Sequence, residues 1–178
     1  NLFSSRGLGA TKITDIAREA QIAQGLVYHY FSSKEEIFTE LIDQSFKKLN
    51  SACLMLEQDQ SSAKVKIEKA IDALLLGLHE NRDTARHHLF IAMATASDAT
   101  PQKARAIIES ENRVAYDVLE RIMIQGQKEG TIKQCNPQVL AVLFWTTILG
   151  LAIYKSSHPN RTVIPDKSLI TCLFFKEQ

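Results

Sequence analysis

The sequence predicts an all-α protein, and three observations lead to that prediction. Apolar residues recur every three to five positions along most of the chain, close to the period of an amphipathic helix. Glycine and proline are scarce, at 7 and 4 of 178 residues, which disfavours turn-rich β folds and glycine-rich nucleotide folds. The pairs Thr100-Pro101 and Asn136-Pro137 each place a capping side chain before a proline, which is a typical helix start.

The expected helices follow one another from residue 33 onward. The first covers 33–56, with Ser33 as its N-cap and Glu36 reaching back to the Ser33 amide in a capping box. A second carries apolar residues at steps of three and four and ends near Asn81. A third covers about 84–97.

Three further elements complete the expected helical part. A long helix has Thr100 as N-cap and Pro101 at its first position, and ends at the C-terminal glycine Gly130. The next begins at Asn136-Pro137, contains the apolar run 139–154 and is broken at 158–160. A last amphipathic piece covers 165–175. The apolar run is shorter than the roughly 18–20 residues of a bilayer span, so no membrane association is expected.

Charge and cysteine content restrict the classes of function. The 21 basic and 20 acidic residues give a net charge of +1, which excludes a histone-like polycation but permits local phosphate contacts. The three cysteines form no CxxC pair, so neither a zinc site nor a disulfide framework is expected, and a reducing cytoplasm fits best. His87 and His88 are adjacent on a helix, cannot chelate one ion together, and are interpreted as a polar surface or pocket edge.

Catalytic motifs are missing from the sequence. It contains no GxSxG, HExxH or Walker loop and no paired catalytic carboxylates, so we expect neither an enzyme nor a bound cofactor or metal.

Residues 11–34 differ from the rest because they form two short pieces, TKITDIAREA and QIAQGLVYHYF, joined by a tight link. The apolar face of the first is expected to comprise Ile13, Ile16, Ala17 and Ala20, and that of the second Ile22, Leu26, Val27 and Phe31. This arrangement is typical of a helix-turn-helix, in which a short helix positions a second helix whose outer face is free to enter a DNA groove. The second helix is expected over 24–30. The alternative is that its aromatic residues form a cluster in a helical core.

The stretch 16–38, IAREAQIAQGLVYHYFSSKEEIF, resembles the DNA-binding signature of the tetracycline-repressor (TetR) family, roughly I-A-x-x-A-G-V-S-x-G-x-x-Y-x-x-F-x-S-K-E-x-L. The resemblance is specific for about residues 1–48. It implies a DNA-binding domain over 1–48 and an effector-binding and dimerisation domain over 49–178. Two positions depart from the family pattern. Gln21 replaces the turn glycine, and Ala23 replaces the Ser or Thr that caps the next helix.

Eight residues are expected to contact DNA. Gln24 can bond to adenine, and Gly25 allows close approach of the backbone. The resemblance assigns phosphate contacts to Tyr28, Tyr30 and Lys34, and the amides around Thr14 can bind another phosphate. The full set is Lys12, Thr14, Gln24, Gly25, Tyr28, His29, Tyr30 and Lys34.

The resemblance also implies a dimer and an effector pocket. A two-turn helix contacts only a few base pairs, so two copies are expected to bind a palindromic operator. By resemblance, the dimer forms through the last two helices, about 137–156 and 165–176. A small hydrophobic effector is expected among the helices spanning about 50–130, beside the helix that begins at Ser33. The pocket candidates are Met55, Leu74, Leu78, Phe90, Met93, Tyr116, Leu119, Met123 and Trp145.

Together these features predict a cytoplasmic DNA-binding regulator, a repressor that a small apolar effector releases from its operator. The alternative is a helical small-molecule-binding module with a degenerate DNA head, which the residues at Gln21 and Ala23 suggest.

Overall fold

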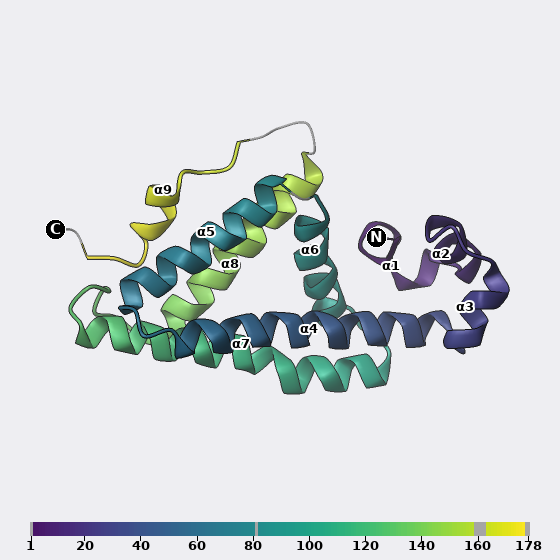
Figure 1. Cartoon of the computed structure of the whole chain (residues 1–178), viewed down its shortest axis with the longest axis horizontal. Coiled ribbons are helices and arrows are strands. Elements are labelled where there is room, and N and C mark those ends of the chain that lie inside the picture. The colour runs from purple at the N-terminus through teal and green to yellow at the C-terminus, as the bar shows by residue number, and fades with distance from the viewer. Residues whose placement is uncertain (1, 81, 159–162, 177–178) are drawn as a thin grey trace.

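The computed structural model describes residues 2–80, 82–158 and 163–176, and over these residues the chain is all-α, as predicted. One isolated antiparallel bridge, Ile132 with Phe175, accompanies the helices. The helices are α1 (Leu2–Ala10), α2 (Ile13–Glu19), α3 (Gln24–Tyr30), α4 (Lys34–Gln58), α5 (Ala63–Glu80), α6 (Arg82–Ala96), α7 (Gln102–Lys128), α8 (Pro137–Ser157) and α9 (Lys167–Thr171) (Figure 1).

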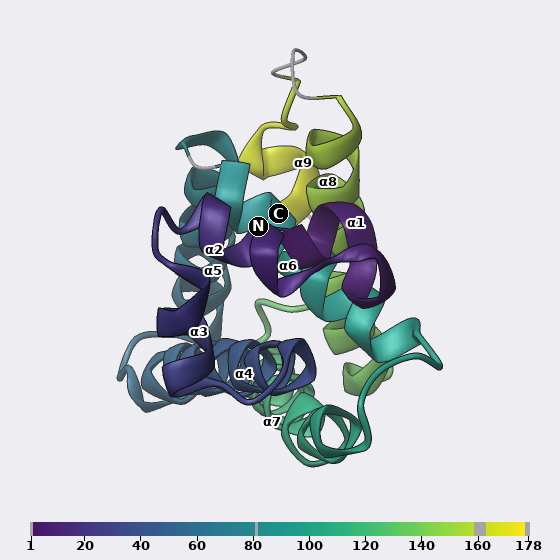
Figure 2. The same cartoon turned by 90° about the vertical axis from the view of Figure 1, so that its right-hand side faces the viewer.

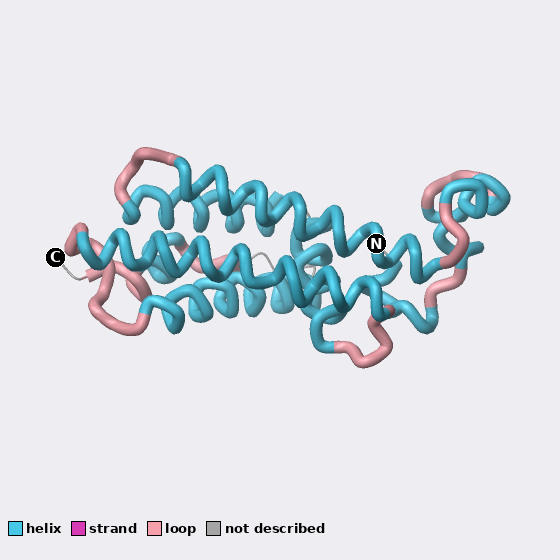
Figure 3. Tube along the Cα trace, turned by 90° about the horizontal axis from the view of Figure 1, so that it is seen from below, coloured by secondary structure: helices cyan, strands magenta, loops and turns pink. Residues whose placement is uncertain are grey.

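Helices α1–α3 form a small head at one end of the molecule, and α5–α9 form a larger body (Figure 1). α4 joins the two and lies side by side with α7 (Figure 3). Viewed from the head, α1 lies in front of α6 (Figure 2). α4 has 25 residues and therefore spans about 37 Å at 1.5 Å per residue. The domain boundary expected at residue 48 falls inside this continuous helix.

The capping box expected at the start of α4 is only half formed. The Ser33 hydroxyl accepts from the Glu36 amide at 3.2 Å, as predicted. The Glu36 carboxylate, however, accepts from the Ser32 amide at 2.6 Å and the Ser32 hydroxyl at 2.7 Å, and not from Ser33. These two hydrogen bonds lower the pKa of Glu36. The second half of the box is displaced because Ser32 offers the carboxylate two donors.

The two ends of α7 differ in how well the sequence predicts them. Thr100 is not its N-cap, because the Thr100 hydroxyl is buried and donates to the Ala94 carbonyl near the end of α6 at 2.7 Å. The cap position is Pro101, without a side-chain hydrogen bond. Gly130 ends the helix as predicted, with φ of 76°. The Gly130 amide donates to Gln127 at 3.2 Å and the next amide donates to Gly126 at 2.9 Å, which together form a Schellman motif.

The prediction of a C-terminal helix over 165–176 is wrong, because α9 contains only five residues. After it the chain turns and pairs with the segment that follows α7: the Lys133 amide donates to Phe174 at 2.9 Å and the Lys176 amide donates to Thr131 at 3.1 Å. Phe174 is fully buried, with its ring 5.9 Å from that of Phe144. A continued helix would lose these amide pairs, so burial of Phe174 is favoured over helix length.

α8 begins as predicted, since the Asn136 side chain accepts from the Gln138 amide at 2.9 Å and Pro137 takes the first position. The helix has 21 residues, more than the apolar run suggests, and by length and composition alone it could span a membrane. In the structure it packs against α6 and α7.

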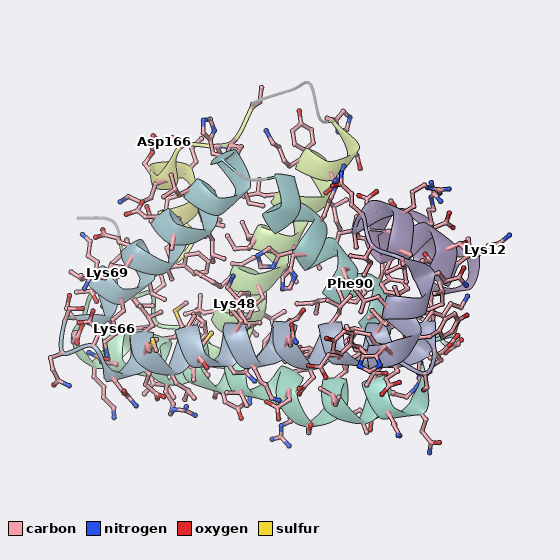
Figure 4. All side chains as sticks on the ribbon, turned by 45° about the vertical axis from the view of Figure 1, so that its right-hand side comes forward. Lys12, Lys48, Lys66, Lys69, Phe90 and Asp166 are labelled. Atoms are coloured by element: carbon pink, nitrogen blue, oxygen red, sulfur yellow. The ribbon has the colours of Figure 1, made fainter. Side chains whose placement is uncertain are left out.

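The two larger apolar clusters hold the molecule together. One fills the body between α5, α7 and α8 and includes Ile71, Ile122 and Phe144. The other joins the head to the body and contains Val27, together with an aromatic trio from α1, α4 and α6. In the trio the ring centroids of Phe3 and Phe38 lie 5.3 Å apart, those of Phe38 and Phe90 5.1 Å, and those of Phe3 and Phe90 6.3 Å. Phe90 therefore places α6 in direct contact with the head (Figure 4).

Candidate DNA-binding surface and effector cavity

The turn between α2 and α3 has the geometry of a glycine turn but contains Gln21. Its φ of 56° is the only positive value at a non-glycine position among the described residues. The Gln21 amide donates to Arg18 at 3.2 Å and the Ile22 amide donates to Ala17 at 3.0 Å, the same Schellman pattern that Gly130 forms. A left-handed conformation costs a non-glycine residue about 1–2 kcal/mol. The head retains its turn in spite of this cost.

α3 also lacks a side-chain cap, as the sequence predicted: its N-cap residue is Ala23, and no side chain accepts from the first turn. Such a missing cap costs about 1 kcal/mol. Both departures from the family pattern are therefore real features of the backbone, and both lower the stability of the head without removing the helix.

α3 is exposed on nearly all sides, and Val27 is its only buried residue. Tyr28 is 52% exposed and Tyr30 69% exposed, so the alternative of an aromatic core cluster is wrong for these two rings. Ile22 and Leu26 were expected on the buried face but are 41% and 44% exposed. Within the head, α3 packs mainly against α2. Such a short helix with one neighbour buries only one of its seven residues, Val27.

Five of the eight expected DNA contacts lie on α3, and all five are exposed: Gln24, Gly25, Tyr28, His29 and Tyr30. The His29 and Tyr30 rings pack edge to face at 5.0 Å. A Cβ added to Gly25 would meet nothing within 4 Å, so packing inside the protein does not require a glycine there.

The cations of the head are unequally engaged. The Asp15 carboxylate pairs with Arg6 at 3.6 Å and with Arg18, and accepts from the Lys12 amide at 3.4 Å. The Lys12 ammonium is exposed at the outer end of the head and has no partner within the part of the chain that the structure describes (Figure 4). Thr14 is exposed beside it. Lys12 is therefore a cation available to an external anion.

Lys34 has a different role from the expected phosphate contact. Its ammonium donates to the carbonyls of Leu8 at 2.8 Å, Gly9 at 3.0 Å and Thr11 at 3.0 Å. All three of its donors are thus used on backbone carbonyls at the C-terminal end of α1 and just after it. In this structure Lys34 ties the start of α4 to α1.

A cavity of about 230 Å³ lies between α4 and three helices of the body, α6, α7 and α8. Its lining comprises Phe46 and Leu49 from α4; His88, Ile91, Ala92 and Thr95 from α6; Asn112, Ala115 and Tyr116 from α7; and Trp145, Ile148 and Leu149 from α8. Of the nine predicted pocket residues, only Tyr116 and Trp145 are among them.

The other predicted pocket residues lie elsewhere. Met55 is 71% exposed on α4, and Met93 is 42% exposed. Phe90 belongs to the aromatic trio, and with Met93 it borders a separate cavity of about 200 Å³ near α1. The remaining four pack in apolar clusters: Leu74, Leu119 and Met123 in the cluster of the body, and Leu78 in a third, smaller cluster with Ala152. A helical period predicts that a residue faces inward but not which wall it forms.

Among the polar groups of the cavity, the sequence predicted Tyr116 in the pocket and His88 at a pocket edge, whereas Asn112 and Thr95 were not predicted. Burial lowers the pKa of His88 to about 4, with a smaller contribution from the neighbouring His87. Burial and then Lys48 lower the pKa of His87, and burial raises the pKa of Tyr116. The His88 ring is therefore neutral at pH 7. Within the described residues, no group of three His, Cys, Asp or Glu side chains could hold a metal ion.

A short, exposed second helix after a tight turn, held at the end of a helical body with an internal cavity, is the arrangement of a helix-turn-helix protein with a separate sensing domain. Residues 1–41 match the family model for bacterial regulatory proteins of the tetR family. This N-terminal segment therefore has the DNA-binding domain of the TetR family, and the comparisons with known proteins support a TetR-type transcriptional regulator. TetR-type regulators are soluble DNA-binding proteins.

Known proteins resemble this chain in sequence and in fold. The head is 51% identical over 41 residues, 23% of this chain and 20% of the relative, to the HTH-type transcriptional repressor KstR2 of Mycobacterium tuberculosis. The uncharacterized HTH-type transcriptional regulator YhgD of Bacillus subtilis is 23% identical over 158 residues, 88% of this chain and 80% of that one. The fold matches AibR in complex with isovaleryl coenzyme A and operator DNA, with a TM-score of 0.73, 20% identity, and coverage of 97% and 89%.

Proposed function

We propose that this regulator is a repressor that binds a palindromic operator as a homodimer and is released by a small apolar effector. The observation that carries the proposal is the exposure of α3, which buries Val27 alone and leaves Gln24, Tyr28 and Tyr30 available to DNA. Gln24 reads an adenine, while the two tyrosines and Lys12 contact phosphates. The repressor KstR2, similar in this segment, supports the direction of control.

The dimer forms through the exposed stripe of α8. Along this helix Val139, Val142, Thr146, Gly150 and Ile153 are exposed at steps of three and four residues. An apolar stripe of this kind needs a partner. A Cβ added to Gly150 would meet nothing within 4 Å, so the glycine leaves room for a second helix. α9 is too short to supply the second long helix that was expected in the interface.

Effector binding reaches the head through α4 and α6. α4 carries Phe46 in the cavity wall and Phe38 in the aromatic trio, and α6 carries His88 and Phe90 in the same two places. A ligand that separates α4 from α6 therefore shifts both supports of α1, and the two heads no longer match successive major grooves. By thermodynamic linkage, operator DNA weakens effector binding by the same factor.

The proposed activity is binding and not catalysis, because each step is a binding equilibrium without covalent change. Function on genomic DNA implies a cytoplasmic location. The free, exposed thiols of Cys135 and Cys172 agree with that reducing compartment.

DNA binding is tested by fluorescence anisotropy with the DNA upstream of the protein's own gene. We expect binding that weakens steeply with salt, since phosphate contacts release counterions. Gln24→Ala should lose about 1–3 kcal/mol of discrimination at one base pair of each half-site, whereas Gln102→Ala, exposed at the start of α7, should bind like the wild type. Absence of binding even at low salt would instead favour a small-molecule-binding module with a degenerate head.

The dimer is tested by light scattering after gel filtration. Val142→Glu places a charge in the α8 stripe and should produce a folded monomer, because a buried unpaired charge is strongly disfavoured. Leu76→Glu is the matched control, since Leu76 is 55% exposed on α5, outside the stripe. A wild type that is monomeric at micromolar concentration, or a dimer that survives Val142→Glu, contradicts the proposed interface.

A further inference from the structure

The cavity between α4, α6, α7 and α8 carries no formal charge. None of its twelve lining residues is an Asp, Glu, Lys or Arg, and most are aliphatic or aromatic. An ionised ligand would exchange its hydration for a wall that offers no opposite charge, which is unfavourable. The lining therefore disfavours a ligand that buries a carboxylate, phosphate or ammonium group among these twelve residues.

Three side chains that can form hydrogen bonds line the cavity and have no hydrogen-bond partner in the part of the chain that the structure describes. No hydrogen bond to the His88 ring, the Asn112 amide or the Tyr116 hydroxyl occurs within the described residues, and all three are half-buried. By contrast, the Thr95 hydroxyl donates to Ile91 at 2.8 Å, and the Trp145 ring nitrogen lies 3.5 Å from the Ala115 carbonyl. Half-buried polar groups are stable when a ligand or water completes their hydrogen bonds.

His88 contributes to this set as a neutral hydrogen-bonding group and not as a cation. The basic groups near it are His87 on α6 and Lys48 on α4, beside His87, while Tyr116 faces the cavity from α7. With a pKa of about 4, protonation of His88 at pH 7 is disfavoured by a factor of about a thousand. A carboxylate ligand would therefore find no positive partner at this position.

The volume restricts the size of the ligand. An apolar cavity of about 150 Å³ in another protein holds benzene. At about 230 Å³, the present cavity has room for a ring with a short side chain, or for a branched chain of about ten non-hydrogen atoms.

We propose that the effector is a small uncharged molecule with an apolar body and one hydroxyl or carbonyl group, which His88, Asn112 and Tyr116 bind. This inference rests on the proposed function, because it assigns a chemical class to the ligand of the same cavity. The apolar walls from α4 and α8 hold the body of the molecule, and the polar residues of α6 and α7 orient its oxygen.

The single tryptophan of the chain, Trp145, lines the cavity and serves as the probe. Three compounds share one apolar body: 4-propylphenol, propylbenzene and 4-propylbenzoate. Fluorescence titration at pH 7 should show that the phenol binds at least about tenfold more tightly than either other compound. The inference is overturned if the benzoate binds as well as the phenol, if the hydrocarbon equals it, or if none of the three binds.

Variants test the assigned residues. Tyr116→Phe and His88→Leu should each remove most of the preference for the phenol over propylbenzene and leave propylbenzene binding intact. Tyr116→Phe removes a single oxygen, so it remains informative if His88→Leu does not fold. Leu76→Ala, exposed on α5, is the control and should keep the preference. An unchanged preference in both cavity variants contradicts the assignment.

The same titration with operator DNA present separates the two proposals. If the phenol binds with the expected preference but leaves the operator complex unchanged, the effector-release function is wrong and the cavity assignment stands. If the operator is released by a charged thioester such as isovaleryl coenzyme A and not by the phenol, the release function stands and the chemical class proposed here is wrong.

Discussion

In α7 of the body, eight of 27 residues are buried, whereas in α3 of the head only Val27 of seven is. α7 is held by α4, α5 and α8 along its length. α3 depends on one apolar contact, on the strained turn at Gln21 and on a first turn without a cap. The body is therefore stabilised by its own packing, while the head leaves most of α3 free for a partner.

Gly126 of the body and Gly25 of the head show the same difference in packing when a methyl group is added at each position. Gly126 in α7 has no room for a side chain, since an added Cβ would lie 2.4 Å from Ile132 and 3.0 Å from Ala63. Gly25 in α3 has open space around it. Packing inside the protein disfavours a side chain at Gly126 and places no such restriction on Gly25.

The largest loss of stability is expected from a substitution in the aromatic trio, where head and body meet. Phe90→Ala removes a buried ring that touches Phe3 and Phe38, and should lower the free energy of unfolding by about 3–5 kcal/mol. Urea unfolding followed by circular dichroism measures this loss. Tyr30→Ala, an exposed ring in the head, should change stability by less than about 0.5 kcal/mol. Equal effects of the two variants would mean that the head is not held by this contact.

Acid should weaken the body through His88. Its pKa is about 4 in the folded protein, below the usual 6.5, so the unfolded chain binds more protons between these two pH values. The free energy of unfolding should therefore rise with pH from about 4 to 6.5 and level off above. Because the ring is half-buried, we expect an effect of about 1–3 kcal/mol.

Unfolding titrations at fixed pH values test this dependence. His88→Gln should flatten the slope, and His29→Gln, at an exposed position in the head, should leave it unchanged. A slope of opposite sign would contradict the buried, neutral state of His88.

The same substitution at the two glycines should have opposite signs. Gly126→Ala gains helix propensity but overpacks against Ile132, and should destabilise the body by about 1–2 kcal/mol net. Adding Ile132→Val, which removes the closest methyl group, should recover part of the loss. Thermal unfolding of the single and double variants measures both effects, and a stabilised single variant would show that Ile132 can move aside.

Gly25→Ala should instead stabilise α3 by about 1 kcal/mol, because alanine favours the helix and its methyl group meets no other atom. It should also weaken operator binding by about tenfold or more if the backbone approaches the DNA here. Hydrogen exchange of the α3 amides and fluorescence anisotropy report the two quantities. Unchanged DNA affinity would show that Gly25 does not lie at the interface.

The smallest change in stability is expected from substitutions at the two Schellman turns, at Gln21 and Gly130. Gln21→Gly relieves a left-handed conformation and should stabilise the head by about 1 kcal/mol, while Gly130→Ala introduces one into the body at a similar cost. Denaturant unfolding of the whole chain measures the change in the free energy of unfolding for each variant. If Gln21→Gly is neutral, the Gln21 side chain compensates for the backbone strain in the folded protein.

Much of the fold was predictable because its signals are local. The all-α class, the start of α8 at Asn136 and Pro137, and the end of α7 at Gly130 depend on residues within one or two helical turns of each other. The same holds for the two anomalies of the head, at Gln21 and Ala23. The exposure of Gln24, Tyr28 and Tyr30 also agrees with the expected outer face, although their contacts with DNA remain predictions.

Interactions between distant residues were decided only by the tertiary structure. Lys34 donates to carbonyls 23 to 26 positions earlier, and Thr100 to Ala94 instead of its own helix. The cavity joins side chains of four helices, which is why Met55 lies outside it and His88 inside.

Local sequence signals were sufficient for the start of α8, the end of α7 and the short exposed helix after a strained turn, because each of these depends on the backbone conformation of a few neighbouring residues. Only the tertiary structure decided that α9 stops early to bury Phe174, that Phe90 links head and body, and which groups face the cavity. The physical reason is that a helical period specifies one inward face. The rotation of that face and the helix opposite it depend on how the whole set of side chains packs.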